Sequence, residues 1–183
     1  MSAASHRSTD DDGASHLKRG RRLPDIPLPT TGGRTISFAR LAGRAVVYCY
    51  PWTGAPGVPN PPAWDDIPGA HGSTPQTEGF RDLHAGFLQL GAAVFGLSTQ
   101  STGYQKEMVE RLRVPFEIVS DERFLLQAAL ALPTFETGGV RYLRRLTLGI
   151  RDGRIERVYY PIDAPAAHAR EVCAWLGMID RTH

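Results

Sequence analysis

The side chains that could do chemistry in this sequence gather between residues 68 and 82. Ser73 is followed three residues later by Gln76, a spacing typical of a capping box at the start of a helix. His71 lies two residues before Ser73 and could act as a general base, although a loop histidine is more often simply exposed to solvent. The segment therefore allows two interpretations of Ser73: a reactive or ligand-binding residue, or a structural helix cap.

Sulfur chemistry has little support outside this segment. The two cysteines, Cys49 and Cys173, are not part of a CxxC pair and do not have the spacing of zinc ligands. Cys49 falls in an apolar stretch and is interpreted as a small buried hydrophobic residue, and Cys173 as a packing residue on a helix. Because two cysteines are too few for a disulfide framework, we expect a reduced, intracellular setting. Few histidines and cysteines lie near one another in the sequence, so we also expect no structural metal.

Alternation and helical periodicity predict the elements that must position these residues. Continuous apolar runs indicate buried strands, and the Asp152-Gly153 pair indicates a hairpin turn. The order β-α-β-α-β-α-β-β-α predicts one α/β domain, in which a mixed sheet has helices on both faces. The predicted strands are 35–38, 45–50, 92–98, 115–121, 140–150 and 154–160, and the predicted helices are 76–89, 103–112, 124–132 and 165–176, with a helical turn at 38–43.

A long proline-rich loop separates the first buried strand from the first predicted helix. Residues 51–75 show no periodicity and contain Trp52 and Trp64. A loop of this length inside a compact domain is usually functional or disordered, and its tryptophan and proline content favours order. We therefore expect the loop to be packed and to cover the Ser73 pocket, with the tryptophans either forming the pocket wall or only pinning the loop.

Composition and charge set the class of protein. The 183 residues are 42% hydrophobic and 22% charged, with a net charge of +2, which is typical of a globular domain. Residues 1–22 lack periodicity and are predicted to be a disordered tail, and residues 23–183 the folded domain. The charge excess falls in that tail and the remainder is neutral, which argues against a nucleic-acid surface. No apolar run is long enough to span a bilayer, so a cytoplasmic location without membrane association is expected.

Several segments, in order, resemble those of the peroxiredoxin family. Residues 68–82 resemble the P-G-C-T-x-x-x-C-x-F-R-D stretch of the bacterioferritin-comigratory-protein-like branch. Residues 48–51 resemble its Y-F-Y-P strand end, 95–98 its G-V-S strand, 115–121 its F-P-L-L-S-D segment and 145–150 its R-S-T-F-L-I strand. The resemblance spans roughly residues 23–177 and implies a thioredoxin-like, peroxiredoxin-type α/β fold.

The same resemblance implies an activity and a set of site residues. The family reduces hydrogen peroxide or organic hydroperoxides with a thiol reductant, works as a monomer or homodimer, and needs neither an organic cofactor nor a metal. Ser73 occupies the position of the peroxidatic cysteine, and Arg145 matches the arginine that stabilises the thiolate. Glu78 stands where two-cysteine members have their resolving cysteine, and Ala70 where the family usually has threonine. We further expect His71, Thr74, Gln76 and Trp52 to lie around the pocket.

A serine at position 73 changes what this site can do. A thiolate attacks the peroxide O–O bond, whereas a serine hydroxyl is un-ionised at neutral pH and cannot be oxidised to a sulfenic acid. With Ser73 the chain is therefore expected to be inactive as a thiol peroxidase. Three interpretations remain: a serine introduced in place of a native cysteine, a redox-dead relative that binds a small molecule or a protein, and an enzyme repurposed for non-redox chemistry.

Overall fold

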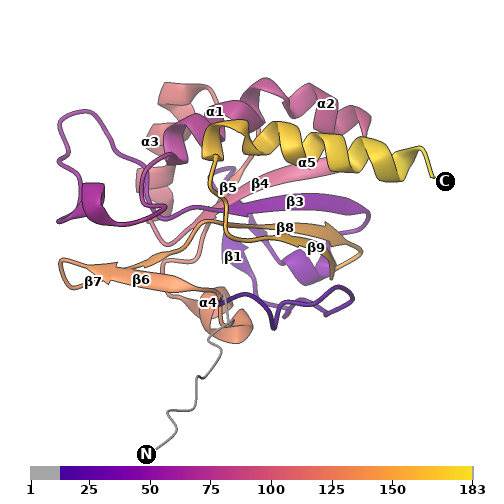
Figure 1. Cartoon of the computed structure of the whole chain (residues 1–183), viewed down its shortest axis with the longest axis horizontal. Coiled ribbons are helices and arrows are strands. Elements are labelled where there is room, and N and C mark those ends of the chain that lie inside the picture. Colours follow the sequence, from indigo (N-terminus) through magenta and orange to yellow (C-terminus); the bar gives the residue numbers. More distant parts are fainter. Residues whose placement is uncertain (1–12, 183) are drawn as a thin grey trace, which may run out of the picture.

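The fold is built on a five-stranded mixed sheet, seen in the computed structural model that describes residues 13–182 (Figure 1). The strand order is β5-β4-β3-β8-β9, with β3 parallel to β4 and antiparallel to β8. The strands of this sheet are β3 (Arg44–Cys49), β4 (Ala92–Ser98), β5 (Ile118–Ser120), β8 (Leu146–Arg151) and β9 (Arg154–Tyr159). The remaining strands form two-stranded pairs: β1 (Leu28–Pro29) with β2 (Thr35–Ile36), and β6 (Thr134–Thr137) with β7 (Val140–Leu143).

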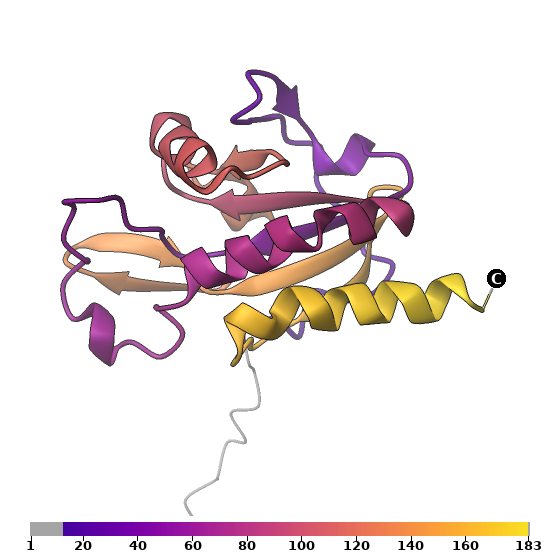
Figure 2. The same ribbon diagram turned by 90° about the horizontal axis from the view of Figure 1, so that it is seen from above.

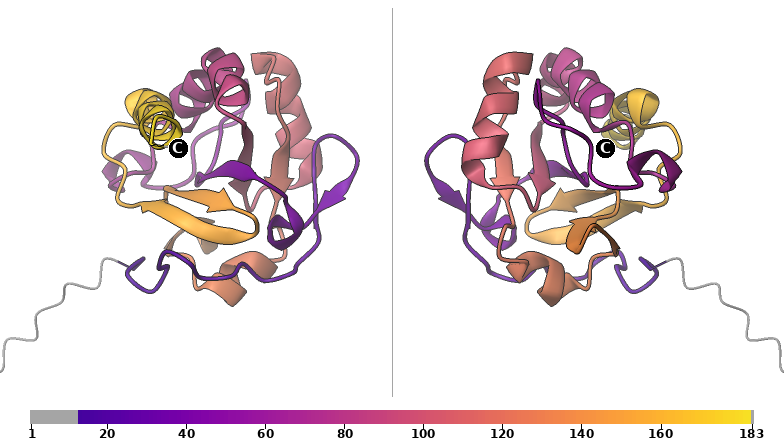
Figure 3. Two further views of the ribbon diagram at one scale, coloured as in Figure 1. Left: turned by 90° about the vertical axis from the view of Figure 1, so that its right-hand side faces the viewer. Right: turned by 90° about the vertical axis from the view of Figure 1, so that its left-hand side faces the viewer.

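Helices lie on both faces of the sheet, as predicted (Figure 3). One face is covered by α1 (Ser73–Asp82), α2 (His84–Gln89), α3 (Thr102–Leu112) and α5 (Pro165–Asp180). The other carries α4 (Leu125–Leu130), the 3-10 helix η1 (Phe38–Arg40) and residues 14–23. A second 3-10 helix, η2 (Trp64–Asp66), lies in the long loop. None of the helices among residues 13–182 is long and apolar enough to cross a membrane.

The central strand β3 shows why the sheet is buried on both sides. Val46 and Tyr48 point into the core beneath α1 and α5, whereas Val47 and Cys49 point into the core beneath α4. Successive side chains of a strand face opposite sides, so an uninterrupted apolar run fits only a doubly covered strand. On the first face α1 and α5 pack side by side (Figure 2), which brings the start of α5 close to the start of α1.

The predicted disordered tail needs correction over its described part. Ala14 and Leu17 are buried in the core beneath α4, and Gly20 N–H donates to the carbonyl of Ile155 at 2.7 Å. The segment is thus fastened to β9 by backbone hydrogen bonds that sequence composition does not reveal. The rest of that prediction, residues 1–12, lies outside the described part of the chain.

The first long predicted helix and the predicted strand before the last hairpin turn are each divided in the structure. The helix expected at 76–89 begins at Ser73 and is interrupted at Leu83, giving α1 and α2. The strand expected at 140–150 is broken at Arg144 and Arg145, and its first half pairs with β6 in a hairpin. That break decides the position of Arg145, because it turns the backbone between a separate hairpin and the main sheet.

Candidate functional site

The site begins at the first turn of α1. Ser73 is the first helical residue rather than the cap, which is Gly72. The Ser73 hydroxyl therefore forms no capping bond, and the first helical hydrogen bond runs from Gln76 N–H to the Gly72 carbonyl at 3.0 Å. Gly72 has a φ of 109° and lies against Pro165, leaving no room for a Cβ. The predicted capping box is thus wrong, because the helix begins one residue earlier than that motif requires and the Ser73 hydroxyl lies beside Arg145 instead.

Arg145 reaches the Ser73 hydroxyl from the turn before β8. Its Nη2 donates to Ser73 Oγ at 3.2 Å, and its Nη1 donates to Gln76 Oε1 at 2.6 Å. The same Nη2 lies within hydrogen-bonding distance of three backbone carbonyls, those of Gly69 (3.2 Å), Ala70 (3.4 Å) and His71 (3.0 Å). One guanidinium therefore holds both the loop before α1 and the first turn of that helix.

The environment of Arg145 is unusual for a cation. The side chain is 4% exposed, and the described residues include no carboxylate paired with it. Burial lowers the pKa of the guanidinium to about 10, so it remains charged at neutral pH. Within the described residues, Arg145 Nε and Gln76 Nε2 are buried donors without an acceptor. The hydrogen-bond acceptors around the positive charge of Arg145 are therefore all neutral groups.

The long loop forms the pocket in front of Ser73. A pocket of about 290 Å³ is lined by loop residues and by the first residues of α1: Trp52, Gly54, Asn60, Trp64, Ala70, His71, Gly72, Ser73, Thr74 and Pro75. The structure describes the loop over its whole length, residues 51–75. Trp52 and Trp64 both line the pocket, their rings edge-on with centroids 5.6 Å apart.

The β6–β7 hairpin, which sequence periodicity missed, supports this loop. The buried Trp64 ring packs against Tyr142 and Phe135, with centroids 5.3 and 5.7 Å away. Thr137 Oγ1 donates to the carbonyl of Pro62. At the start of the loop, the Gln100 amide Nε2 donates to the carbonyl of Thr53 at 3.2 Å. No motif marks Phe135 or Tyr142, and only the hairpin turn at Gly138 and Gly139 could have signalled this support.

The side chains of the other predicted site residues form no hydrogen bond or ion pair with the side chains of Ser73 and Arg145. His71 has its ring bonded to Asp65 at 2.6 Å and is 57% exposed, so the structure gives it no hydrogen bond to Ser73. Thr74 and Ala70 both line the pocket, and Ala70 is almost completely buried. Glu78 is half-buried one turn into α1 and forms no ion pair with Arg145.

Neither cysteine belongs to this site. Cys49 is buried in β3, where desolvation raises the pKa of its thiol to about 12. Cys173 lies on α5 opposite Gly86, and burial raises its thiol pKa as well. Both are free, consistent with their interpretation as packing residues. Residues 13–182 hold no group of three or more histidine, cysteine, aspartate or glutamate side chains that could bind a metal ion.

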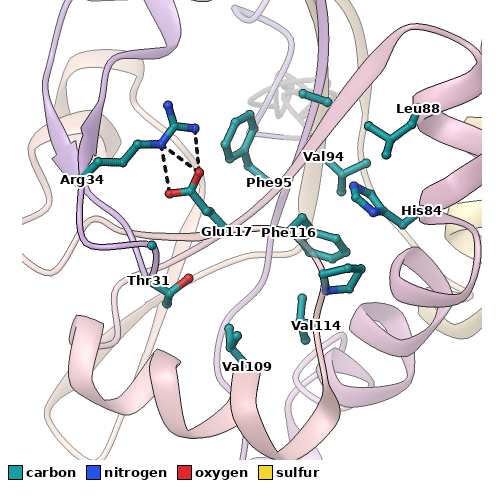
Figure 4. A pocket seen from close by; sticks show the side chains of 13 residues that line it. Thr31, Arg34, His84, Leu88, Val94, Phe95, Val109, Val114, Phe116 and Glu117 are labelled. Carbon is teal, nitrogen blue, oxygen red and sulfur yellow. Dashed lines mark hydrogen bonds and ion pairs between the residues drawn. The ribbon is translucent and has the colours of Figure 1, made fainter.

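A second hollow of about 390 Å³ serves as a contrast (Figure 4). Its wall is mostly apolar, including Val94, Phe95 and Phe116, and its charged end consists of Arg34 and Glu117. These two side chains form an ion pair at 2.6 Å and satisfy each other. This groove therefore has no unpaired charge, in contrast to the site around Ser73.

The fold is that of a thioredoxin-like domain of the peroxiredoxin type, and comparison with solved structures agrees. The peroxidoxin BcpB of Mycobacterium tuberculosis superimposes with a TM-score of 0.72 at 24% identity, covering 90% of this chain and 99% of that one. The bacterioferritin comigratory protein of Xanthomonas campestris, known for alkyl peroxide reduction activity, superimposes with a TM-score of 0.70 at 24% identity, covering 89% of this chain and 99% of that one.

The relatives found by sequence comparison are peroxiredoxins of the Q and Bcp type. Chloroplastic peroxiredoxin Q of Oryza sativa is 27% identical over 156 residues, 85% of this chain and 64% of that protein's length. A putative peroxiredoxin bcp of Coxiella burnetii is 30% identical over 107 residues, 58% of this chain and 61% of that protein. No family model matches the chain. The homologues of this chain are thus peroxiredoxin Q and Bcp proteins, which confirms the resemblance drawn from its sequence. The chain spans less than two thirds of the length of either relative.

Proposed function

We propose that this chain carries the substrate pocket of a peroxiredoxin Q-type protein, in which a serine has replaced the attacking sulfur. The supporting observation is the hydrogen bond of 3.2 Å from Arg145 Nη2 to Ser73 Oγ, at the first residue of α1. A helix N-terminus and a guanidinium both stabilise negative charge on the atom between them. This arrangement suits a thiolate and a polar oxygen ligand in front of it.

The chemistry that this position supports depends on the atom at residue 73. A thiolate would attack one peroxide oxygen, break the O–O bond and become a sulfenic acid, while the other oxygen leaves as alkoxide or hydroxide and takes up a proton. A thiol reductant would then restore the thiol and release water. Ser73 cannot enter this cycle, so the chain binds a peroxide or another small polar molecule without reducing it.

Peroxide consumption with a dithiol reductant tests this function. The chain with Ser73 is expected to show no turnover of hydrogen peroxide or an alkyl hydroperoxide, and Ser73→Cys is expected to acquire turnover. The comparison uses a background in which Cys49 and Cys173 are replaced by alanine, so that sulfur is present only at position 73. Robust turnover by the serine form in that background would refute the proposal, and so would an inactive but folded Ser73→Cys protein.

A further inference from the structure

A separate hollow of about 170 Å³ borders Arg145 and lies outside the Ser73 pocket. It is formed where the break before β8 meets the segment that joins β9 to α5. No residue of α1 lines it, and Arg145 does not line the Ser73 pocket. We call it the arginine hollow, and its lining includes Phe135, Arg144, Arg145, Tyr160, Ile162 and Asp163.

Two guanidinium groups and one carboxylate line the arginine hollow. Arg145 is 4% exposed and Arg144 is half-buried, and neither has a carboxylate partner among residues 13–182. Arg144 instead lies over the Phe135 ring, with its guanidinium carbon 5.5 Å from the ring centroid. Asp163 is exposed and forms no ion pair with either arginine. The lining therefore has an excess of one positive charge, at a place where burial makes an unpaired cation costly.

Hydrogen bonding at Arg145 is unbalanced in the same direction. Nη1 and Nη2 donate to Gln76, to Ser73 and to three carbonyls of the loop before α1. Nε is buried and has no acceptor among the described residues. Buried donors without acceptors are rare in native proteins because they are costly. A shortage of acceptors and a shortage of negative charge both favour an oxyanion as the ligand of this hollow.

The remaining wall of the arginine hollow is apolar. Phe135 and Ile162 are each 8% exposed, and Tyr160 and Pro161 continue the same wall. A protein cavity of about 150 Å³ is large enough to hold one benzene molecule, so this hollow has room for a ligand of similar size. An apolar wall with a few polar groups is typical of sites that bind small organic molecules.

We propose that the arginine hollow binds a small organic carboxylate. The ligand's carboxylate pairs with the guanidinium of Arg144, which can hold two oxygens at once, and compensates the charge of Arg145. Its short apolar body lies against Phe135 and Ile162. This inference goes beyond the proposed function, since it requires no reaction at residue 73. Because Arg145 also bonds to Ser73, a carboxylate in the hollow and a negative charge at residue 73 are expected to oppose each other.

Titration of the full chain with propionate and with propionamide tests the ligand class. The two molecules have nearly the same shape and differ in charge. Calorimetry and thermal unfolding at constant ionic strength are expected to show saturable binding of propionate and a rise in Tm, and neither effect with propionamide. Equal effects of the two compounds, or effects that grow linearly without saturation, would overturn the inference.

Arg144→Gln tests the location of the site. Loss of this guanidinium is expected to lower the propionate affinity by about tenfold or more, as for other hydrogen bonds to charged groups. Arg151→Gln is the matched control, because it makes the same change of charge at an exposed position at the end of β8. Unchanged affinity in Arg144→Gln, or an equal loss in Arg151→Gln, would contradict a site in the arginine hollow.

Asp163→Asn tests the same location by a gain. Asp163 lines the hollow, and its negative charge repels a bound carboxylate. The substitution is therefore expected to raise the propionate affinity by about threefold, the effect of one exposed charge. An unchanged or lower affinity would contradict the proposed position of the ligand.

The thiol of Ser73→Cys tests the link to residue 73, in a background without Cys49 and Cys173. Saturating propionate is expected to raise the thiol pKa by about half a pH unit or more, because the bound carboxylate offsets the charge of Arg145. Adding Arg144→Gln should abolish this rise. Bound propionate that leaves the thiol pKa unchanged would overturn a site beside Arg145. Peroxide turnover is measured separately, so failure of this inference and failure of the proposed function are distinguishable.

Discussion

Gln76 Oε1 accepts a hydrogen bond from Arg145 Nη1 at 2.6 Å and so joins two elements that are 69 positions apart in the sequence. The bond fixes the first turn of α1 against the break that precedes β8. Because both side chains are almost completely buried, this contact is shielded from water and from salt. It makes the orientation of Ser73 a property of the folded core rather than of a flexible loop.

Introducing sulfur at position 73 is expected to give a thiol of low pKa. The helix N-terminus and Arg145 both favour the thiolate, so the pKa of Ser73→Cys should lie below the free-cysteine value of about 8.5. The measurement is the pH dependence of thiol alkylation in a background without Cys49 and Cys173. Adding Arg145→Ala should raise the pKa again; a thiol that titrates at or above the free value with Arg145 intact would contradict the expectation.

Gly72→Ala is expected to destabilise the protein. The residue has a φ of 109°, and a Cβ there would collide with the Pro165 ring. We expect a loss of about 1–3 kcal/mol in the free energy of unfolding, measured by denaturant titration. Gly103→Ala serves as the control, since Gly103 lies in α3 with open space around it and should gain about 0.5–1 kcal/mol. Equal effects at both positions would show that Gly72 is not sterically required.

Trp64→Ala is expected to loosen the loop over the pocket. Trp64 is 3% exposed and contacts Trp52, Phe135 and Tyr142, so its truncation should cost about 3–5 kcal/mol. Limited proteolysis should then cut first between residues 51 and 75, while the wild type resists cleavage there. The exposed loop residue Val58 supplies a control, and Val58→Ala should leave both stability and cleavage unchanged. Early cleavage elsewhere in Trp64→Ala would argue against this role.

His168 is expected to make stability fall in mildly acidic solution. Its ring is buried between α5 and β8, where Nε2 contacts Thr147 Oγ1 at 2.8 Å. Burial lowers the pKa of the ring below 6.5, with a smaller opposing contribution from Glu171. The unfolded chain therefore binds a proton that the folded chain does not, and stability is lost as pH falls from about 6.5 through the lower folded pKa.

Urea unfolding across that pH range measures the effect. His168→Gln should flatten the pH dependence, whatever its effect on stability at neutral pH. His84, whose pKa is lowered by burial too, is the comparison, and because it is less buried His84→Gln should flatten the profile less. Profiles of equal slope for the wild type and His168→Gln would refute the assignment.

Local pattern was sufficient to predict much of this protein. The apolar runs of β3 and β4 are typical of strands that are covered on both faces of a sheet. The bounds of both strands were predicted within a residue or two. The Asp152-Gly153 turn was also predicted, since both residues adopt the positive φ that a tight hairpin requires. The segment around Ser73 and the position of Arg145 followed from the resemblance to peroxiredoxins.

The contacts between those residues depend on the fold as a whole. Ser73 followed by Gln76 is locally typical of a capping box. In the fold, however, Gly72 is the cap, and the side chains of Ser73 and Gln76 both accept hydrogen bonds from Arg145. The hairpin beneath Trp64 and the packing of residues 13–22 depend likewise on partners distant in sequence. A local sequence pattern reflects the structural preferences of neighbouring residues. The partners of a buried charge instead depend on which residues, distant in the sequence, the fold brings into the same water-free space.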